Sequence, residues 1–427
     1  MTVTTAVAVL PHRVAGWATR RALARNSLTG IELGCSLCAV VWFAAGTSLA
    51  ALAGGTALAG GYLCRRVGRQ LTVGTFDGWL AGGCELAGEL ALYAALAVGA
   101  LATQGGFWPL DTRLPDALDN PWKMATAAAV LLGLRTVVGL CRPGPVAPAA
   151  PGDGQPGHSG FARFAALASQ VAAFPAGERA LVITGTAVFA GPRFTLLVLT
   201  GWGVVALAWA VIVGPGRSRA PDRPAAPGTG RAGCAACRDD GPIARFAGRL
   251  VHGQLVPLPP AVAGLVATVL LAMLGLGDLA GPVLLTPVAA MLLAAPGSAH
   301  PHSGPLDWLT PAIIQAGQYS YLAALGFARG VPGPVTFALI GLVALRQLDV
   351  AYQARHAPAG SGPRGGLGWE GRMLAAGTGA MFGIATVSYL ALAVYLGWLL
   401  GTGALSSWFA LRGGRATAAS AGRLPAS

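Results

Sequence analysis

The sequence predicts an all-α protein, a polytopic transmembrane helix bundle with about ten to twelve spans arranged in two units. Hydrophobic residues make up 54% of the 427 residues and charged residues only 11%, whereas soluble domains carry about 25% charged residues. Long stretches also lack any Asp, Glu, Lys or Arg; one runs from Glu32 to Arg65 and another from Arg372 to Arg412. In lipid the backbone has to satisfy its own hydrogen bonds, so such stretches form helices.

The net charge is strongly positive, at +13, and comes almost entirely from arginine, with Lys123 as the single lysine. The arginines lie beside the apolar stretches, which is the positive-inside pattern of membrane proteins and does not indicate a nucleic-acid partner. Anionic lipid headgroups are the counter-charge that this pattern predicts. The Ala, Gly, Arg and Pro bias is typical of high-GC bacteria. We therefore expect a multi-pass protein of the bacterial cytoplasmic membrane with its N-terminus in the cytoplasm.

Residues 1–213 are predicted to form the first membrane domain. Residues 12–26 interleave arginines with apolar side chains, which predicts an interfacial helix lying on the membrane surface. Arginines at 65–69 mark the end of the second span, and a Gly-Pro-Arg break at 191–193 separates the last two. The apolar segments predict six spans near residues 30–47, 49–64, 78–102, 123–140, 180–191 and 194–213.

Residues 214–241 are dense in Pro, Gly and Arg, which predicts a cytoplasmic linker that buries no core. A second membrane domain of unknown function is predicted at 242–412, followed by a disordered tail at 413–427. Eleven crossings in total would place the C-terminal arginines outside, so Gly401 and Gly403 are interpreted as a re-entrant turn. The apolar segments of the second domain lie near residues 258–277, 280–296, 308–328, 333–348 and 374–400.

Charged residues at membrane depth are the candidate functional residues, because an ionisable group is costly there. Three carboxylates share one helix face by their spacing: Asp77, Glu85 and Glu89. Candidate phosphate-binding or headgroup-binding arginines are Arg65, Arg66, Arg69 and Arg135. Such a set suits a divalent cation and a phosphate, since Mg²⁺ takes one or two carboxylates plus phosphate oxygens. The alternative is an acidic helix start whose carboxylates pair with the nearby arginines.

The second domain carries polar residues of its own. Arg346 and Asp349 lie one helical turn apart and are predicted to pair. The segment 369–372, with a tryptophan, a glutamate and an arginine, is interpreted either as an interfacial belt or as a headgroup site. His300 and His302 favour loop packing over a metal site. The C-x-x-C pairs at 35–38 and 234–237 give only a weak metal signal.

Four stretches of the first domain form recognisable motifs: an arginine-rich stretch at 17–29, the sequence FDGWLAGGCE at 76–85, and two short motifs with Gly and Arg at 177–179 and 191–195. They resemble the surface helix, the third span and the last two spans of the CDP-alcohol phosphatidyltransferase family, six-helix membrane enzymes that join a CDP-linked lipid to an alcohol. Residues 253–260, 295–302 and 368–373 resemble an uncharacterised membrane domain fused to such enzymes in actinobacteria.

The resemblance implies a site of four aspartates that bind two metals and a diphosphate, in the pattern D-x2-D-G-x2-A-R-x8-G-x3-D-x3-D. This chain departs from the pattern. Residues 63–71, where the first half would fall, contain no aspartate. Ala81 stands at the third aspartate position, Glu85 at the fourth, and Asp77 at a glycine position. One or two carboxylates are too few to offset two cations on a diphosphate. The simplest interpretation is a family fold whose usual catalytic site is lost.

The leading hypothesis is therefore a catalytically degenerate membrane protein with a lipid-related or scaffolding role. Two alternatives stay open: an active CDP-alcohol phosphatidyltransferase of phospholipid synthesis with an altered metal site, and a transporter-like protein. In the active case Glu85 would be the catalytic base, and Asp77 and Glu85 would hold Mg²⁺ or Mn²⁺; otherwise no cofactor is expected. The expected partners are membrane lipids, among them a CDP-linked lipid or phospholipid headgroups, and a second copy of the chain in a homodimer.

Overall fold

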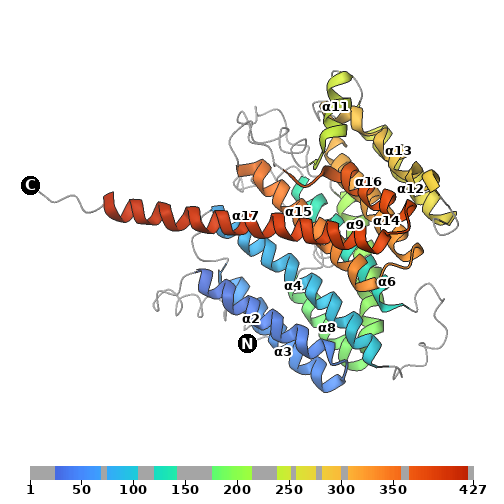
Figure 1. The fold of residues 1–427 in the computed structure, drawn as a ribbon. Coiled ribbons are helices and arrows are strands. Elements are labelled where there is room, and N and C mark those ends of the chain that lie inside the picture. The colour runs from blue at the N-terminus through green and yellow to red at the C-terminus, as the bar shows by residue number, and fades with distance from the viewer. Residues whose placement is uncertain are drawn as a thin grey trace, which may run out of the picture.

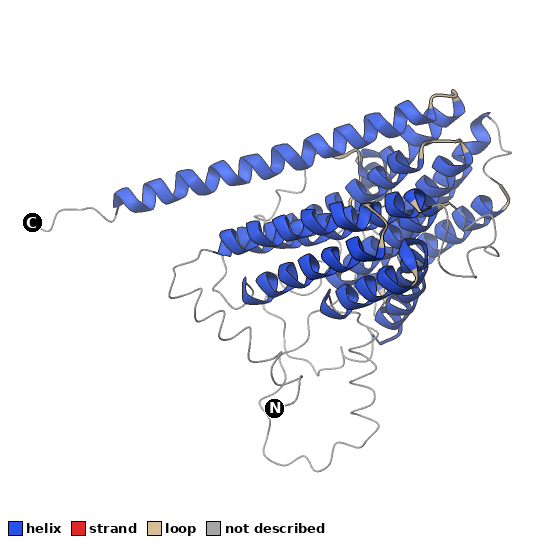
Figure 2. Ribbon diagram, turned by 90° about the horizontal axis from the view of Figure 1, so that it is seen from below, coloured by secondary structure: helices blue, strands red, loops and turns tan. Residues whose placement is uncertain are grey.

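The computed structural model describes residues 25–68, 75–103, 120–141, 176–213, 238–251, 256–275, 281–299, 306–356 and 365–421. Within these ranges all regular secondary structure is helical, and no strand occurs (Figure 2). The all-α prediction is thereby confirmed for the part of the chain that the structure describes. The predicted surface helix at 12–26 falls almost wholly outside these ranges, as do most of the linker at 214–241 and both histidines of the 300–302 motif.

The first half of the chain forms helices at each of the six predicted spans. Gly46, in the turn after the first helix, adopts a left-handed φ of +73°, and Gly191, at the break between the last two helices, has a φ of +88°. The helices are α2 (Arg25–Ala44), α3 (Ser48–Gly68), α4 (Thr75–Ala102), α6 (Pro121–Cys141), α8 (Ala176–Phe189) and α9 (Gly191–Val213).

The turn between α2 and α3 packs against the end of α4 through glycine. A Cβ on Gly99 would lie 2.4 Å from the carbonyl oxygen of Phe43 and 3.2 Å from the Cα of Gly46. Both neighbours are backbone atoms, which cannot rotate away as a side chain can. Glycine at position 99 therefore allows α4 to approach the hairpin closely.

We expect Gly99→Ala to destabilise the protein by about 1–3 kcal/mol, the usual cost of forcing extra volume into a packed core. Gly139→Ala is the matched control, because a Cβ on this glycine of α6 would meet nothing within 4 Å. Alanine favours helix by about 1 kcal/mol over glycine, so the control is expected to be neutral or stabilising. Thermal unfolding of the two purified variants measures the difference, and equal midpoints would contradict the close packing.

The second half of the chain forms α11 (Pro242–Leu250), α12 (Leu258–Met273), α13 (Thr286–Leu292), α14 (Thr310–Ala328), α15 (Gly333–His356), α16 (Gly368–Met381) and α17 (Ala385–Ala421). Short 3-10 turns flank α13 and precede α14: η2 (Gly281–Leu285), η3 (Ala295–Ala299) and η4 (Asp307–Leu309). In Figure 1, α17 extends far beyond the other helices toward the C-terminus.

The prediction of one apolar span at 374–400 is wrong, because two helices occupy this segment. Gly383 has a φ of +75° and its N–H bonds to the carbonyl of Ala380, while the N–H of Ile384 bonds to that of Gly379. This pair of bonds is the Schellman motif that ends a helix. Gly401 and Gly403, interpreted as a re-entrant turn, lie within α17 instead. Polarity could not reveal the break, because its turn residues are as apolar as the helices.

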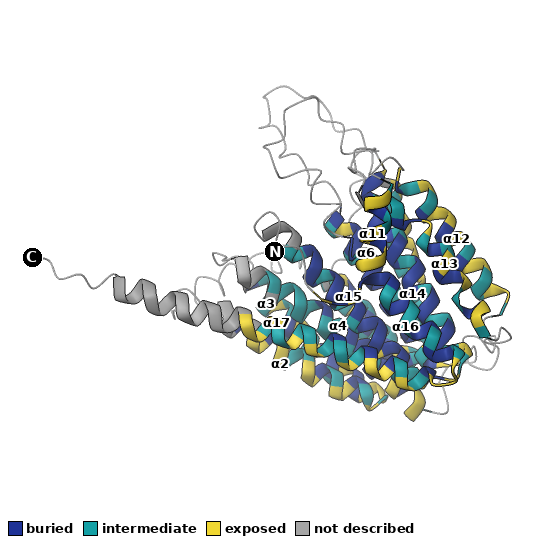
Figure 3. Ribbon diagram, turned by 45° about the horizontal axis from the view of Figure 1, so that its top comes forward, coloured by how far each residue is buried: buried dark blue, intermediate teal, exposed yellow. Residues whose placement is uncertain are grey.

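The two halves of the chain share one hydrophobic core. Buried residues from both sides of the 214–241 segment form one cluster, including Leu96 of α4, Ala129 of α6, Tyr319 of α14 and Leu339 of α15. Helix α15 packs against both α4 and α6. In Figure 3 α14 and α15 are largely dark blue, whereas the described side chains of α17 are mostly intermediate or exposed. The division into domains 1–213 and 242–412 stays a prediction.

Five helices of the described chain are long and apolar enough to cross a membrane: residues 81–102, 121–141, 191–212, 333–353 and 385–406. Large apolar side chains on α9 and α17 are exposed, including Val205, Ile212, Val394 and Trp398. Exposed apolar surface of this extent suits lipid and not water. The larger number of about ten to twelve spans depends on the shorter helices and stays a prediction.

Candidate functional site

The candidate site is a set of charged side chains from α2, α3, α4 and α8 inside the bundle. Arg65 of α3 lies between two glutamates: its Nε and Nη2 donate to Oε1 of Glu32 on α2, at 2.7 and 2.6 Å. Its Nη1 pairs with Oε1 of Glu85 on α4 at 2.7 Å. The tight α2–α3 turn and the packing of α4 on α2 bring these helices side by side. One guanidinium therefore neutralises carboxylates from two other helices.

A second ion pair lies beside the first. Arg179 in the first turns of α8 pairs with Glu89 of α4, and both side chains are mostly buried. Tyr93, one helical turn after Glu89, shares a side-chain hydrogen bond with Arg179. Arg135 of α6 lies close enough to Glu89 and Arg179 to interact with both charges. Arg135, a candidate phosphate-binding residue by sequence, therefore lies beside this ion pair.

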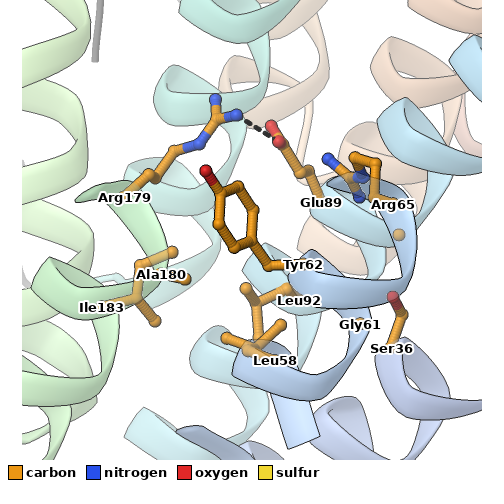
Figure 4. A pocket seen from close by; sticks show the side chains of 11 residues that line it. Ser36, Leu58, Gly61, Tyr62, Arg65, Glu89, Leu92, Arg179, Ala180 and Ile183 are labelled. Atoms are coloured by element: carbon orange, nitrogen blue, oxygen red, sulfur yellow. Dashed lines mark ion pairs between the residues drawn. The ribbon is translucent and has the colours of Figure 1, made fainter. Parts of the chain in front are cut away.

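A small cavity opens between these ion pairs (Figure 4). Its upper part in the figure is polar, where Arg179, Glu89 and the Tyr62 hydroxyl converge, and its lower part is apolar. Its volume is about 50 Å³, enough for a few water molecules. The other lining residues are Ser36, Leu58, Gly61, Arg65, Gly88, Leu92, Ala180 and Ile183. A phospholipid headgroup would need the cavity to widen.

The structure brings together some of the predicted site residues. Glu85 pairs with Arg65, which is the pairing alternative of the sequence analysis. Arg66 is half-buried on α3, while the side chain of Asp77 and all of Arg69 lie outside the described residues. Sequence reasoning missed Glu32 and Arg179 as members of the site. Glu32 is an isolated charge near the start of a predicted apolar span, and Arg179 follows Glu178 directly before another such span; a charge in this position was the available signal.

Charge balance governs what this site can do chemically. Three carboxylates (Glu32, Glu85 and Glu89) face three guanidiniums (Arg65, Arg135 and Arg179) within the site. Buried charges are retained only when paired, so each group holds its partner in place. Among the described residues no three His, Cys, Asp or Glu side chains converge as metal ligands do. The donor set around Glu85 thus fits ion pairing and does not fit two metals on a diphosphate.

A second polar cluster joins the segment before α11 to the start of α16. Arg372 is fully buried and its Nη1 pairs with Oδ2 of Asp239 at 2.6 Å. The same nitrogen donates to the carbonyl of Gly366 at 3.2 Å, and Nη2 donates to Oε1 of Gln318 on α14 at 3.3 Å. This arginine therefore ties three segments of the second half together. We call Arg238, Asp239, Asp240, Trp369, Glu370 and Arg372 the clasp.

Glu370 of α16 caps the N-terminus of another helix, α11. Its carboxylate accepts the N–H groups of Gly241 and Ala244, at 3.0 and 3.1 Å, at the N-terminus of α11. These N–H groups lack partners within the helix, so the carboxylate satisfies them from another element. Trp369 donates its indole N–H to Asp240 at 2.9 Å. The interpretation of 369–372 as an interfacial belt is wrong, since Trp369, Glu370 and Arg372 are fully buried.

The chain before α16 is shaped to meet these arginines. Gly365, Gly366, Leu367 and Gly368 all have positive φ, and Leu367 is the sole non-glycine with positive φ among the described residues. Glycine adopts this conformation without steric cost, whereas leucine does not. The carbonyls of Gly365 and Gly366 accept hydrogen bonds from Arg346 and Arg372 respectively. The two guanidiniums thus stabilise a backbone shape that the glycines make accessible.

A hydrogen bond links the two halves near this cluster. The predicted pair of Arg346 and Asp349 is confirmed, with Nη1 and Oδ2 at 2.6 Å. Asp349 also accepts the indole N–H of Trp79, on α4, at 3.1 Å. Trp79 lies six residues before Glu85 on the same helix, so α4 contributes to both polar clusters. Trp79 belongs to the FDGWLAGGCE motif at 76–85, and nothing in the sequence indicates that it bonds to Asp349.

Comparison with known proteins bears on the second half only. Residues 230–423 match the model of a family of unknown function (DUF5941). No curated protein and no solved structure matches the chain. The clasp and the Arg346–Asp349 pair lie inside the matched region, whereas the Arg65 and Arg179 ion pairs lie outside it.

Proposed function

We propose that the chain is a multi-pass protein of the bacterial cytoplasmic membrane in which twelve helices cross or enter the bilayer. Six helices of the first half are followed by six of the second: α12, α13, α14, α15, α16 and α17. Short turns join α2 to α3, α8 to α9, α14 to α15 and α16 to α17. An even number of crossings returns the C-terminus to the side of the N-terminus.

The distribution of cations supports a cytoplasmic N-terminus. Among the described residues, Arg193 and Arg329 lie next to these short turns, and Lys123 lies in the first turn of α6, where Trp122 contacts Gly333 at the α14–α15 turn. Far more lie toward the opposite helix ends, including Arg65, Arg66, Arg179, Arg238, Arg245, Arg249, Arg346 and Arg372. The arginine-rich side of a membrane protein is the cytoplasmic side.

We further propose that the first half has a CDP-alcohol phosphatidyltransferase-like arrangement without the transfer activity, and that the protein has a lipid-related or scaffolding role. The observation that carries this proposal is the position of Arg65 between Glu32 and Glu85. Glu85 is the residue that the family resemblance places at the catalytic base. Its carboxylate is held by a guanidinium, and Ala81, one helical turn earlier, stands where the family pattern has another aspartate.

The chemistry explains why such a site would not turn over. Transfer of a phosphatidyl group requires stabilisation of the leaving nucleotide's charge, which metals normally supply and which dominates such displacements. Arg65 and Arg179 carry positive charge, but glutamates already neutralise them. A phosphate would have to displace Glu89 from Arg179 or Glu85 from Arg65. A charge-balanced set of buried ion pairs fits a helix scaffold better than a phosphate-transfer site.

We expect the purified protein to release no CMP from CDP-diacylglycerol with common alcohol acceptors, in the presence of Mg²⁺ or Mn²⁺. Chromatographic detection of CMP measures the outcome, with an active family enzyme as a positive control. Glu85→Gln and Glu32→Gln form a matched pair, because both glutamates bind Arg65 and only Glu85 stands at the base position. Metal-dependent CMP release that is lost in Glu85→Gln and kept in Glu32→Gln would establish the active-enzyme alternative instead.

A further inference from the structure

Helix α11 presents three different stripes of side chains around its axis. Small residues, Ala244 and Gly248, are buried on one side. Large apolar residues, Ile243, Phe246 and Leu250, are exposed, with exposed fractions of 42%, 62% and 64%. Arg245 and Arg249 are also exposed. At 100° per residue the three stripes lie roughly 120° apart, so the apolar and cationic stripes border the outward face.

The orientation of α11 is fixed by the rest of the protein. Its small-residue stripe packs against η3 and its N-terminus is capped by the carboxylate of Glu370. Arg238, three residues before the N-cap residue Gly241, donates to the carbonyls of Ala294 and Gly297 at 3.2 Å. The helix therefore cannot rotate to bury Phe246 without breaking these contacts.

The position of α11 suits a membrane surface. It packs against η3, which follows α13, and against the start of α16, on the side where most of the described arginines lie. The start of α12 lies beside η3, because Pro257 contacts Gly297, and the outer face of α12 forms an open apolar groove lined by Leu258, Val262, Val266 and Leu270, among others. An exposed apolar face beside cations, above an apolar groove, is the arrangement of an interfacial helix.

We propose that α11 binds anionic phospholipids of the surrounding leaflet, with Arg245 and Arg249 contacting the headgroup phosphates. Ile243, Phe246 and Leu250 enter the boundary between headgroups and acyl chains, and an acyl chain lies along the groove on α12. Charge complementarity selects this occupant. No carboxylate of the described residues pairs with Arg245 or Arg249, whereas a second copy docked on this face would bring four arginines together. The proposal rests on the membrane embedding above and is independent of phosphatidyl transfer.

The test uses the full-length protein, with native cysteines replaced, in vesicles of phosphatidylcholine and phosphatidylglycerol. Phe246→Cys carries an environment-sensitive fluorophore, and quenching by spin-labelled versions of each lipid gives their relative binding at this site. Each arginine near an anionic surface strengthens binding about five-fold, so we expect roughly a 25-fold preference for phosphatidylglycerol at low salt. Added salt should weaken the preference.

Matched variants separate the headgroup contact from general lipid exposure. Arg245→Gln and Arg249→Gln should each reduce the preference about five-fold, and together abolish it. Val394→Cys, exposed on α17, should be quenched equally by both lipids. Three results would overturn the proposal: no quenching by lipid at Phe246→Cys, a preference that the arginine variants leave unchanged, or a disulfide between two copies through the introduced thiol. None of these three results bears on CMP release. The lipid-binding proposal for α11 can therefore fail while the proposal of lost transfer activity stands, and the reverse.

Discussion

Replacing Arg372 by methionine is expected to destabilise the folded protein by about 3–5 kcal/mol, because it leaves the carboxylate of Asp239 buried without a counter-charge. Arg372 is fully buried, and its guanidinium also satisfies Gly366 and Gln318. Methionine keeps the approximate length of the side chain, so loss of charge and hydrogen bonds dominates the effect. Thermal unfolding in detergent, followed by loss of the monodisperse gel-filtration peak, measures the change.

Two further variants identify the cause. Arg372→Met combined with Asp239→Asn removes the orphaned charge, so it should recover part of the lost stability. Arg249→Met removes an exposed arginine from α11 and should stay within about 0.5 kcal/mol of the parent protein. If Arg372→Met unfolds at the same temperature as Arg249→Met, the clasp contributes no stability and its role would have to be reconsidered.

Labelling with an impermeant thiol reagent is expected to give opposite results at two positions in intact cells, once the native cysteines have been replaced. Phe382→Cys should label readily, because Phe382 is 72% exposed in the turn between α16 and α17. Ser218→Cys should resist labelling until the cells are permeabilised, because its arginine-rich segment is predicted to be cytoplasmic. The contrast should be close to all-or-none, since a bilayer excludes the charged reagent.

The pair of positions tests the topology in both directions. Labelling at Ser218→Cys in intact cells would reverse the orientation of the whole protein. Absence of labelling at Phe382→Cys, with normal labelling after permeabilisation, would place the α16–α17 turn on the cytoplasmic side. That result would remove α16 and α17 from the helices proposed to cross the bilayer.

The sequence could predict most helices because a membrane imposes a simple composition rule on them. Charge-free stretches and glycine or proline breaks located all six helices of the first half to within a few residues at most ends. The same rule failed where the chain turns without polar residues, at Phe382, Gly383 and Ile384. A turn stabilised by main-chain hydrogen bonds and one left-handed glycine has no signature in hydropathy.

The polar residues were easier to find than their partners. Arg346 and Asp349 are neighbours on one helix, so their spacing predicted the pair. Arg65 and Glu32 come from two helices, and Arg372 of α16 pairs with Asp239 in the segment before α11, so these contacts depend on how distant parts of the chain pack. The interpretation of Trp369 as a membrane anchor failed for the same reason. Aromatic residues mark interfaces on average, yet this one is enclosed by the segment before α11.

The packing of α15 on α4 and α6 has a consequence for any polypeptide that consists only of the region 230–423. The face of α15 that meets α4 and α6 would be bare, and Asp349 would lose the indole N–H of Trp79. Such a polypeptide would have to obtain an equivalent pair of helices from a separately encoded subunit. Otherwise it would enter the membrane with this face of α15 unpacked. In this chain the first half supplies that surface in cis, which fixes the ratio of the two halves at one to one.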